Sequence, residues 1–528
     1  MICAFRKKSH PRIISSLRFW VHRHAAWLAA SIAVFAISAV VPATATVVRI
    51  QILQTTDLHG YVDYSDELEH GGGMLRLATA IKRRRRIFGR NRTILIDCGD
   101  TVQGTWEAAY SRGQVGIEYL RELDYDVWVP GNHELDYGTE RLLDFCRQTR
   151  GFVTAANLAI QNDHDTYSTP PWRLFRRGPA RIAVIGMTSA AMDCWFWGEQ
   201  YKGYRADPTE QILEQILPRV LVMKPDMIIL AAHQGWLPGE SRGINDIKQI
   251  AEHYPQLDLI LGGHTHWEHA GKEIGPRTWY VQAGRHADML GVIFAEIDTD
   301  KNKVLDITSR LLTIEEDRFT PDKALRDTLT SHWLGAANQA GAKTIGMTES
   351  GISADGRLGV DCPKFELLCR AIAEATQVDA VIHSRLTRFD LKAGPVTRRE
   401  VYMMVPYENG IGVAELTAAQ IITIMEEQQS KRNSYVACGL WGLDIQRDET
   451  GKPRGLLTSD GQQVPASAKF RVAFNSYTLA SGGGRFPTLR KITRQPSANL
   501  RDTGLMTRAV VEAYFRKHSP VNVNELMK

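Results

Sequence analysis

Seven side chains of the types that bind metal ions occur in five short motifs, and each motif directly follows an apolar run. They are Asp57, His59, Asp100, Asn132, His233, His264 and His266. Carboxylate, amide and imidazole groups that recur at strand ends indicate a hydrolytic site that holds two metal ions.

The spacing of Asp57 and His59 predicts how they would meet a cation. In an extended strand end, side chains two residues apart leave the same face, so both can share one ion. His264 and His266 repeat that spacing. Mixed oxygen and imidazole ligation suits zinc, manganese or iron and disfavours calcium. Asp100, on a Gly-Asp turn, is the candidate for a carboxylate that bridges two ions.

Short apolar strands alternate with helical stretches from residue 46 to about 312, which predicts an α/β domain. We expect strands at 94–96, 127–129, 182–185, 227–230 and 259–261. Helices expected at 139–149 and 208–223 are long enough to cross over a sheet. In such sheets ligands gather at the carboxyl ends of the strands, which is where the five motifs lie.

A second domain is expected, because 528 residues exceed what one hydrophobic core usually serves. Thr320 and Pro321 suit the cap and the first position of a linker helix. Beyond it the chain has its own α/β pattern, with helices expected at 364–376 and 417–429 and strands at 378–382, 411–416 and 470–474.

The first 45 residues predict export. Six Lys and Arg precede an acid-free apolar run from Ala25 to Val41, and the segment ends in Pro42-Ala-Thr-Ala45. This order is typical of a secretory signal peptide cleaved after Ala45, and an uncleaved anchor is the alternative. The sequence therefore predicts a periplasmic or secreted protein with no stable membrane span after cleavage.

Removing that basic segment leaves a chain of near-neutral net charge, so no nucleic acid polymer is expected as a partner. Six of the seven cysteines lie beyond it, too few for a fold built on disulfides. Cys362 and Cys369 could form a local bridge, or could lie on two consecutive turns of one helix. Cys98 is interpreted as a buried strand residue.

The motif series resembles the calcineurin-like metallophosphoesterases, because D-x-H, G-D, G-N-H-E, a lone H and G-H-x-H all occur here in order over residues 48 to about 310. The resemblance implies a four-layer αββα sandwich and two divalent metal ions, such as manganese or zinc. It implies one ion held by Asp57, His59, Asp100 and His266, and another held by Asp100, Asn132, His233 and His264. A hydroxide that bridges the ions would attack the phosphoester.

Within that resemblance His133 completes neither ligand set, so we expect it to donate to the phosphoryl group or the leaving oxygen, with Asp136 orienting its ring. An extra ligand or a structural hydrogen bond are the alternatives for His133. His286 follows a strand toward the same edge and is a further candidate for the site wall. Exposed or structural roles are expected for His70, His164, His253 and His269.

Segments 390–409 and 473–487 resemble the C-terminal domain of the 5′-nucleotidase family. In that family one aromatic side chain from each segment sandwiches the nucleotide base. Tyr407 fits the first role, and Asn409 would contact the base. Tyr477 is the first choice for the second aromatic, and Phe486 is the reserve. Together the segments predict a smaller α/β substrate-binding domain.

Arg357 and Arg388 match arginines that face phosphate in that family, and guanidinium groups suit phosphate oxygens. Two departures occur. His383-Ser-Arg-Leu-Thr-Arg388 replaces Asn-Ser-Gly-Gly-Ile-Arg, and Gly482-Gly-Gly-Arg485 replaces Gly-Gly-Asp-Gly. The glycine run followed by Phe-Pro is more similar to the 2′,3′-cyclic-nucleotide phosphodiesterase and 3′-nucleotidase branch.

The sequence therefore predicts an exported binuclear-metal phosphohydrolase that removes phosphate from nucleotides as a 5′-nucleotidase does. A 2′,3′-cyclic-nucleotide 2′-phosphodiesterase with 3′-nucleotidase activity is the alternative within this class. The ligands would also serve hydrolysis of a non-nucleotide phosphoester or of a sulfur group. A non-catalytic nucleotide-binding or adhesion module is the alternative from another class. Expected divisions are a signal peptide (1–45), a metallophosphoesterase domain (46–312), a linker helix (313–342) and a substrate-binding domain (343–528).

Overall fold

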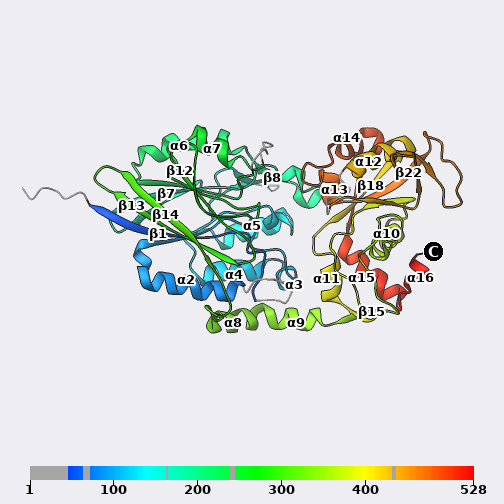
Figure 1. Cartoon of the computed structure of the whole chain (residues 1–528), viewed down its shortest axis with the longest axis horizontal. Coiled ribbons are helices and arrows are strands. Elements are labelled where there is room, and N and C mark those ends of the chain that lie inside the picture. Colours follow the sequence, from blue (N-terminus) through cyan, green and yellow to red (C-terminus); the bar gives the residue numbers. More distant parts are fainter. Residues whose placement is uncertain (1–45, 64–71, 162–164, 238–243, 431–435, 528) are drawn as a thin grey trace, which may run out of the picture.

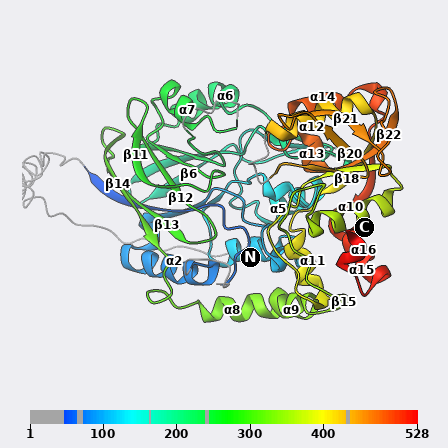
Figure 2. The same cartoon turned by 45° about the vertical axis from the view of Figure 1, so that its right-hand side comes forward.

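The computed structural model describes residues 46–63, 72–161, 165–237, 244–430 and 436–527, so the expected signal segment lies outside the described residues. Two lobes lie side by side, and helices α8 (Lys323–Leu329) and α9 (Gly335–Gly341) run along one edge between them (Figures 1 and 2). Within the described chain, no helix combines the length and the apolar character that crossing a bilayer requires.

The N-terminal lobe contains two large sheets. The first has the order β14-β13-β1-β2-β3, built from Lys303–Thr313, Met289–Asp298, Val47–Thr55, Thr93–Asp97 and Val127–Trp128. The second has the order β11-β12-β10-β9-β7-β6, built from Glu268–Ile274, Thr278–Ala283, Leu259–Leu261, Met227–Ala232, Ala180–Met187 and Trp172–Arg177. All five strands expected in this lobe occur, each with its bounds within two residues.

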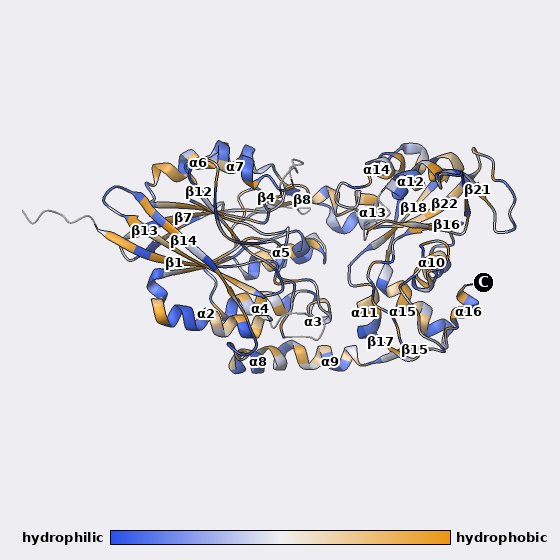
Figure 3. Ribbon diagram, viewed as in Figure 1, coloured by the Kyte–Doolittle hydropathy of each residue, from blue (hydrophilic) through white to orange (hydrophobic). Residues whose placement is uncertain are grey.

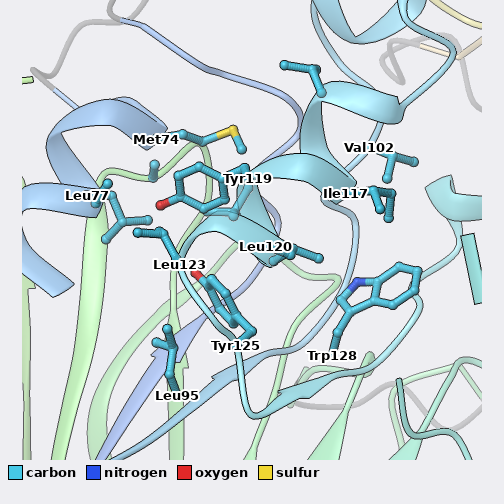
Figure 4. Packing of buried hydrophobic residues seen from close by; sticks show 14 of the residues in the cluster. Met74, Leu77, Leu95, Val102, Ile117, Tyr119, Leu120, Leu123, Tyr125 and Trp128 are labelled. Atoms are coloured by element: carbon cyan, nitrogen blue, oxygen red, sulfur yellow. The ribbon is translucent and has the colours of Figure 1, made fainter. Parts of the chain in front are cut away.

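Apolar side chains point alternately to the two faces of each strand, which explains why the two sheets stack on each other. Ile94 and Ile96 of β2 belong to the core cluster that lies between the sheets, together with Ile229 of β9. Leu95, which points the other way, packs with α2 (Met74–Phe88) and α4 (Gln114–Glu122), as Figure 4 shows. Because both faces of these strands are buried, the strands are apolar throughout.

The outer face of the second sheet is covered in the same way. Helix α6 (Thr209–Val222) turns Leu213, Ile216 and Leu217 toward the sheet, and α7 (Ile247–His253) packs beside it. Figure 3 shows apolar colour concentrated on the strands and mixed colour on these outer helices. The order helix, sheet, sheet, helix is the expected αββα sandwich.

The central strands of each sheet pair in parallel: β1 pairs with β2, β2 with β3, β7 with β9 and β9 with β10. Parallel strands bring their carboxyl ends to one edge of the sheet. The loops that leave β1, β2, β3, β9 and β10 carry all the expected metal ligands. The fold therefore concentrates those side chains at a single edge.

The linker begins later than expected. Helix α8 starts at Lys323, and the Asp322 side chain accepts the backbone N–H of Leu325. The expectation that Thr320 caps the helix and Pro321 opens it was therefore wrong, because Asp322 fills the capping position. A single π-turn (Thr330–Leu334) then joins α8 to α9.

The C-terminal lobe is built on a sheet of order β19-β16-β22-β18-β23, formed by Gly439–Trp441, Ala380–His383, Lys469–Asn475, Gly410–Thr417 and Arg501–Met506. Helices α10 (Pro363–Thr376) and α15 (Thr507–His518) share one core cluster with it, and α12 (Ala418–Ser430) and α14 (Pro487–Thr493) share another. Cys362 caps α10 and Cys369 lies within it, and both are free thiols. No bridge therefore links this pair, and only Cys369 lies on a helical turn, because Cys362 has an extended backbone just before the helix.

Candidate active site

Five of the seven expected ligands have a left-handed backbone conformation. The φ angles are 51° at Asp57 and His59, 55° at Asp100, 70° at His264 and 60° at His266. Such angles are costly for residues other than glycine and concentrate at functional sites. The strands thus end in sharp turns that expose these side chains to one shared space.

The first ligand cluster consists of Asp57, His59 and His266. His59 Nε2 lies 3.0 Å from His266 Nε2, and His266 Nε2 lies 3.4 Å from Asp57 Oδ1. The other ring nitrogen of His59, Nδ1, faces the carbonyl oxygen of Gln103 at 2.8 Å. Donating Nδ1–H to that carbonyl leaves Nε2 as the lone-pair nitrogen, which is the form that binds a metal.

The second cluster consists of Asp100, His233 and His264. His233 Nε2 lies 3.1 Å from Asp100 Oδ2, while its Nδ1 faces the carbonyl oxygen of Cys98 at 2.6 Å. Asn132 Oδ1 lies 3.1 Å from His233 Nε2 and 2.8 Å from His264 Nδ1. The amide oxygen therefore points at the same centre as the two imidazoles.

The two clusters adjoin. Asp100 Oδ2, in the second cluster, lies 4.0 Å from His59 Nε2 in the first. A carboxylate in that place reaches both centres, as a bridging ligand must. The combined donor set of imidazole nitrogens, carboxylates and one amide oxygen fits zinc, manganese or iron.

The local geometry differs from the extended strand ends that the sequence suggested. Asp57 and His59 do converge on one centre, but through left-handed turns. His264 and His266 separate, one into each cluster, which is the division that the family resemblance implied, but their backbone is not the extended one that their spacing suggested. The reason is the positive φ at both residues, which removes the alternation of a strand.

Burial keeps two of the ligand histidines neutral. Desolvation, reinforced by the neighbouring imidazoles, lowers the pKa of His59 and of His264 to about 3. Asp100 is also buried, yet its pKa falls well below the usual value, because the charges of His233 and His133 outweigh desolvation. Neutral imidazole and ionised carboxylate are the forms that ligate metals.

Glu134 is a structural element of the site that the sequence motif did not assign to any role. Its side chain is fully buried and accepts the backbone N–H groups of Asp100 (2.9 Å), Thr101 (2.7 Å) and Gly131 (2.5 Å). Glu134 thereby ties the turn of Asp100 to the turn that precedes Asn132. Its place two residues after a ligand, in G-N-H-E, was the available signal.

Gly131 fixes the same region sterically. A Cβ at this position would lie 2.3 Å from Asp100 Oδ1 and 2.7 Å from His233 Cε1. Real Cβ atoms do not approach other atoms so closely, so the glycine is what allows the two ligand-bearing loops to touch.

His133 stands beside the clusters without joining either. Its Nδ1 lies 3.0 Å from Asp136 Oδ2, which leaves Nε2 for the cavity that His133 lines. Burial lowers the pKa of His133, but the carboxylates of Asp136 and Asp100 outweigh burial and raise it to about 10. At neutral pH the ring is therefore protonated.

Two further groups line the site. His286 lies near the first cluster, with its ring centroid 5.6 Å from that of His59 and 4.0 Å from that of Tyr61. Trp195 lies near the second, with its ring centroid 5.0 Å from that of His264. His286 was a sequence candidate. Trp195 was not, because its loop carries no motif and reaches the site only through the fold.

Both clusters open into a cavity of about 1360 Å³ between the lobes. Tyr407, Asn409 and Tyr477 of the C-terminal lobe line the same cavity. The lobes also meet directly, since Gln103 Nε2 donates to the carbonyl oxygen of Pro406 (2.9 Å). Among the described residues, the fold thus brings these three side chains and the metal ligands to one space.

The remaining three expected substrate residues lie elsewhere. Among the described lining residues of the cavity, Arg357, Arg388 and Phe486 do not occur. Arg357 is exposed and pairs with Asp361, and Arg388 is exposed. Phe486 is fully buried in the core of the C-terminal lobe, against the backbone of Gly482.

Comparison with known proteins finds a matching family for each half of the chain. Residues 50–268 match the family model of the calcineurin-like phosphoesterases, and residues 340–491 match that of the 5′-nucleotidase C-terminal domain. A 5′-nucleotidase of Vibrio parahaemolyticus is 23% identical over 525 residues, with 91% of each chain covered. Endonuclease YhcR of Bacillus subtilis is 22% identical over 492 residues, which are 86% of this chain and 39% of that protein.

Among solved structures, a 5′-nucleotidase precursor from Thermus thermophilus superposes with a TM-score of 0.67 at 18% identity, covering 90% of this chain and 97% of that one. At this identity the likeness shows a shared fold. The family matches go further, because one covers most of the N-terminal lobe and the other covers most of the C-terminal lobe. The chain belongs to the metal-dependent hydrolases that join a calcineurin-like metallophosphoesterase domain to a 5′-nucleotidase C-terminal domain.

Proposed function

We propose that this protein is an exported, binuclear-metal phosphohydrolase that removes phosphate from nucleotides. The observation that carries the proposal is the shared cavity, in which two adjoining ligand clusters face Tyr407, Asn409 and Tyr477. A ligand with a phosphate at one end and a flat base at the other would contact both the ligand clusters and the two tyrosines. Export rests on the sequence of residues 1–45, which predicts a periplasmic or secreted location.

Each group has a place in the reaction. The two clusters, with Asn132, would hold two divalent cations, which polarise the phosphoryl group and stabilise the charge on the attacking and leaving oxygens. Asp136 orients the His133 ring, and His133 donates its Nε2 proton to the leaving oxygen. Tyr407 and Tyr477 would hold the base by stacking, which needs only flat faces.

A second candidate follows from the turn next to Tyr477. All three glycines of this turn, Gly482, Gly483 and Gly484, have positive φ. The turn lacks the aspartate of the Gly-Gly-Asp-Gly pattern, and its Arg485 lines the cavity. Because the guanidinium of Arg485 attracts phosphate and an aspartate would repel it, this turn favours a substrate that carries phosphate on the ribose. This observation supports 2′,3′-cyclic-nucleotide phosphodiesterase with 3′-nucleotidase activity as the alternative.

A substrate panel tests the function. The full-length protein is stripped with EDTA and reloaded with Mn²⁺ or Zn²⁺. It is then given adenosine 5′-monophosphate, 3′-monophosphate and 2′,3′-cyclic monophosphate as separate substrates. Released inorganic phosphate is measured directly for the first two, and after phosphatase treatment of the products for the cyclic compound. We expect metal-dependent release that is fastest from the 5′-monophosphate. Faster turnover of the cyclic and 3′ compounds would favour the second candidate. No turnover of any of them would refute a nucleotidase.

Replacing Glu134 with Gln tests the support of the metal site. A glutamine must turn its NH₂ toward at least one of the three backbone N–H groups that the carboxylate accepts. We expect metal affinity to fall roughly 10- to 100-fold, as for other groups that orient ligands. Glu449→Gln is the control, because Glu449 is exposed. Metal titration monitored by calorimetry measures the change, and equal affinities in both variants would contradict the role.

The variant His133→Ala tests the proton donor. Loss of a general acid should lower kcat by about 10² to 10⁴, while bound metal, measured by mass spectrometry, stays at the parent level. Asp136→Asn should cost less, since the ring remains. His253→Ala, in which an exposed histidine is removed, is the control. Loss of metal from His133→Ala would instead show that His133 is an extra ligand.

The variants Tyr407→Ala and Tyr477→Ala test base recognition. Losing one stacking partner costs about 1 to 3 kcal/mol, so KM for the 5′-monophosphate should rise about 5- to 150-fold. Turnover of glycerol phosphate, which has no base, should stay within about twofold. Phenylalanine at either position should restore KM. If the two substrates lose activity in parallel, these tyrosines do not act on the base.

A further inference from the structure

Among the described residues, one cation on the C-terminal wall of the cavity has no counter-ion. Three arginines of the described part of the chain line the cavity. Arg326 pairs with Asp63, and Arg399 pairs with Glu107. Arg485 has no carboxylate partner among the described residues, and it donates only to Gly482 O (2.9 Å) and to Tyr477 OH (3.5 Å). A half-buried guanidinium with unused donors is suited to an anion.

A second donor meets Arg485 at the same place. The point that a Cβ on Gly483 would occupy lies 2.6 Å from Arg485 Nη1, 3.0 Å from Trp195 Nε1 and 3.5 Å from Tyr477 OH. Trp195 Nε1 has no hydrogen-bond acceptor in the described part of the chain. The Arg485 guanidinium, the Trp195 indole N–H and the Tyr477 hydroxyl thus converge on the bare face of Gly483, where a Cβ would clash with the guanidinium.

Two contacts hold this arrangement together. Gly483 N donates to Cys194 O at 2.9 Å, which fixes the glycine turn next to Trp195. Beside it, Arg490 pairs with Asp193, so the loop of the N-terminal lobe is anchored on the C-terminal lobe. The donors are therefore positioned before any ligand arrives, which lowers the cost of binding.

The place of Arg485 and Trp195 in the cavity indicates which part of a nucleotide they would face. Trp195 packs on the ligand His264, and Arg485 reaches the hydroxyl of Tyr477. The group therefore lies between the metal clusters and the aromatic that is proposed to hold the base. In a nucleotide the ribose is what lies between the base and the reacting phosphate.

We propose that Arg485 and Trp195 form an anion subsite that recognises a second phosphate group carried on the ribose of the substrate. This inference rests on the proposed nucleotide substrate. The preferred substrate class is then a nucleoside bisphosphate, with one phosphate at the metal clusters and the other on Arg485 and the indole N–H. A β-phosphate would also be an anion, but a 5′-diphosphate extends away from the ribose, toward the metal clusters.

The test compares kcat/KM of the full-length, metal-loaded protein for adenosine 5′-monophosphate, adenosine 3′,5′-bisphosphate and adenosine 5′-diphosphate. The parent should prefer the bisphosphate. Arg485→Ala should lower kcat/KM for the bisphosphate about 10- to 100-fold more than it lowers kcat/KM for the monophosphate. Arg485→Lys should recover part of the loss, and Trp195→Phe should lose less than Arg485→Ala. Arg501→Ala, an exposed arginine on β23, is the matched control.

Equal losses on the monophosphate and the bisphosphate would overturn the subsite and show that Arg485 only supports the glycine turn. A selective loss on the 5′-diphosphate would overturn the assignment to a ribose phosphate. If the parent hydrolyses no nucleotide, the proposed function fails, and calorimetry of adenosine 3′,5′-bisphosphate binding then decides the inference separately. Weaker binding in Arg485→Ala than in Arg501→Ala supports the subsite, and equal binding overturns it.

Discussion

The structure depends on bringing buried carboxylates and imidazoles together at one edge of two stacked sheets. Asp57 and Asp100 are almost fully buried, and a buried carboxylate is tolerated only with charged or hydrogen-bonding partners around it. Here the partners are histidines and backbone N–H groups, and a cation would complete the compensation. The left-handed turns at five ligands and the missing side chain at Gly131 allow these groups to pack so closely.

The rest of the molecule positions that edge against a second lobe. The apolar layers fix where strands β1, β2, β9 and β10 end, and the C-terminal lobe closes the space with Tyr407 and Tyr477. Contacts at both sides of the cavity join the lobes, through Gln103 and Pro406 on one side and through Cys194 and Gly483 on the other. The expected metal ligands and the expected base-binding aromatics thus come from different domains, which meet around one cavity.

Much of the fold was predictable from the sequence, because the apolar runs are short, regular and buried on both faces. The strands expected at 94–96 and 259–261 occur as β2 and β10, and the helix expected at 364–376 occurs as α10. Predictions failed where two local signals competed, as at Thr320 and Asp322, or where they assumed an extended backbone, as at His264 and His266. A left-handed turn is decided by the loops that surround it, which residue types alone do not specify.

By itself, the sequence determined which kinds of ligand atoms are present and their order along the chain, since these are properties of the residues. Only the tertiary structure decided how these atoms meet: it reaches the two clusters through left-handed turns and gives Glu134 its three backbone donors. It also distinguished arginines that are chemically identical. Arg357 pairs with Asp361 on the surface while Arg485 faces the cavity without a carboxylate partner among the described residues. The physical reason is that a side chain's partner depends on strand order and backbone direction, which bring together residues hundreds of positions apart.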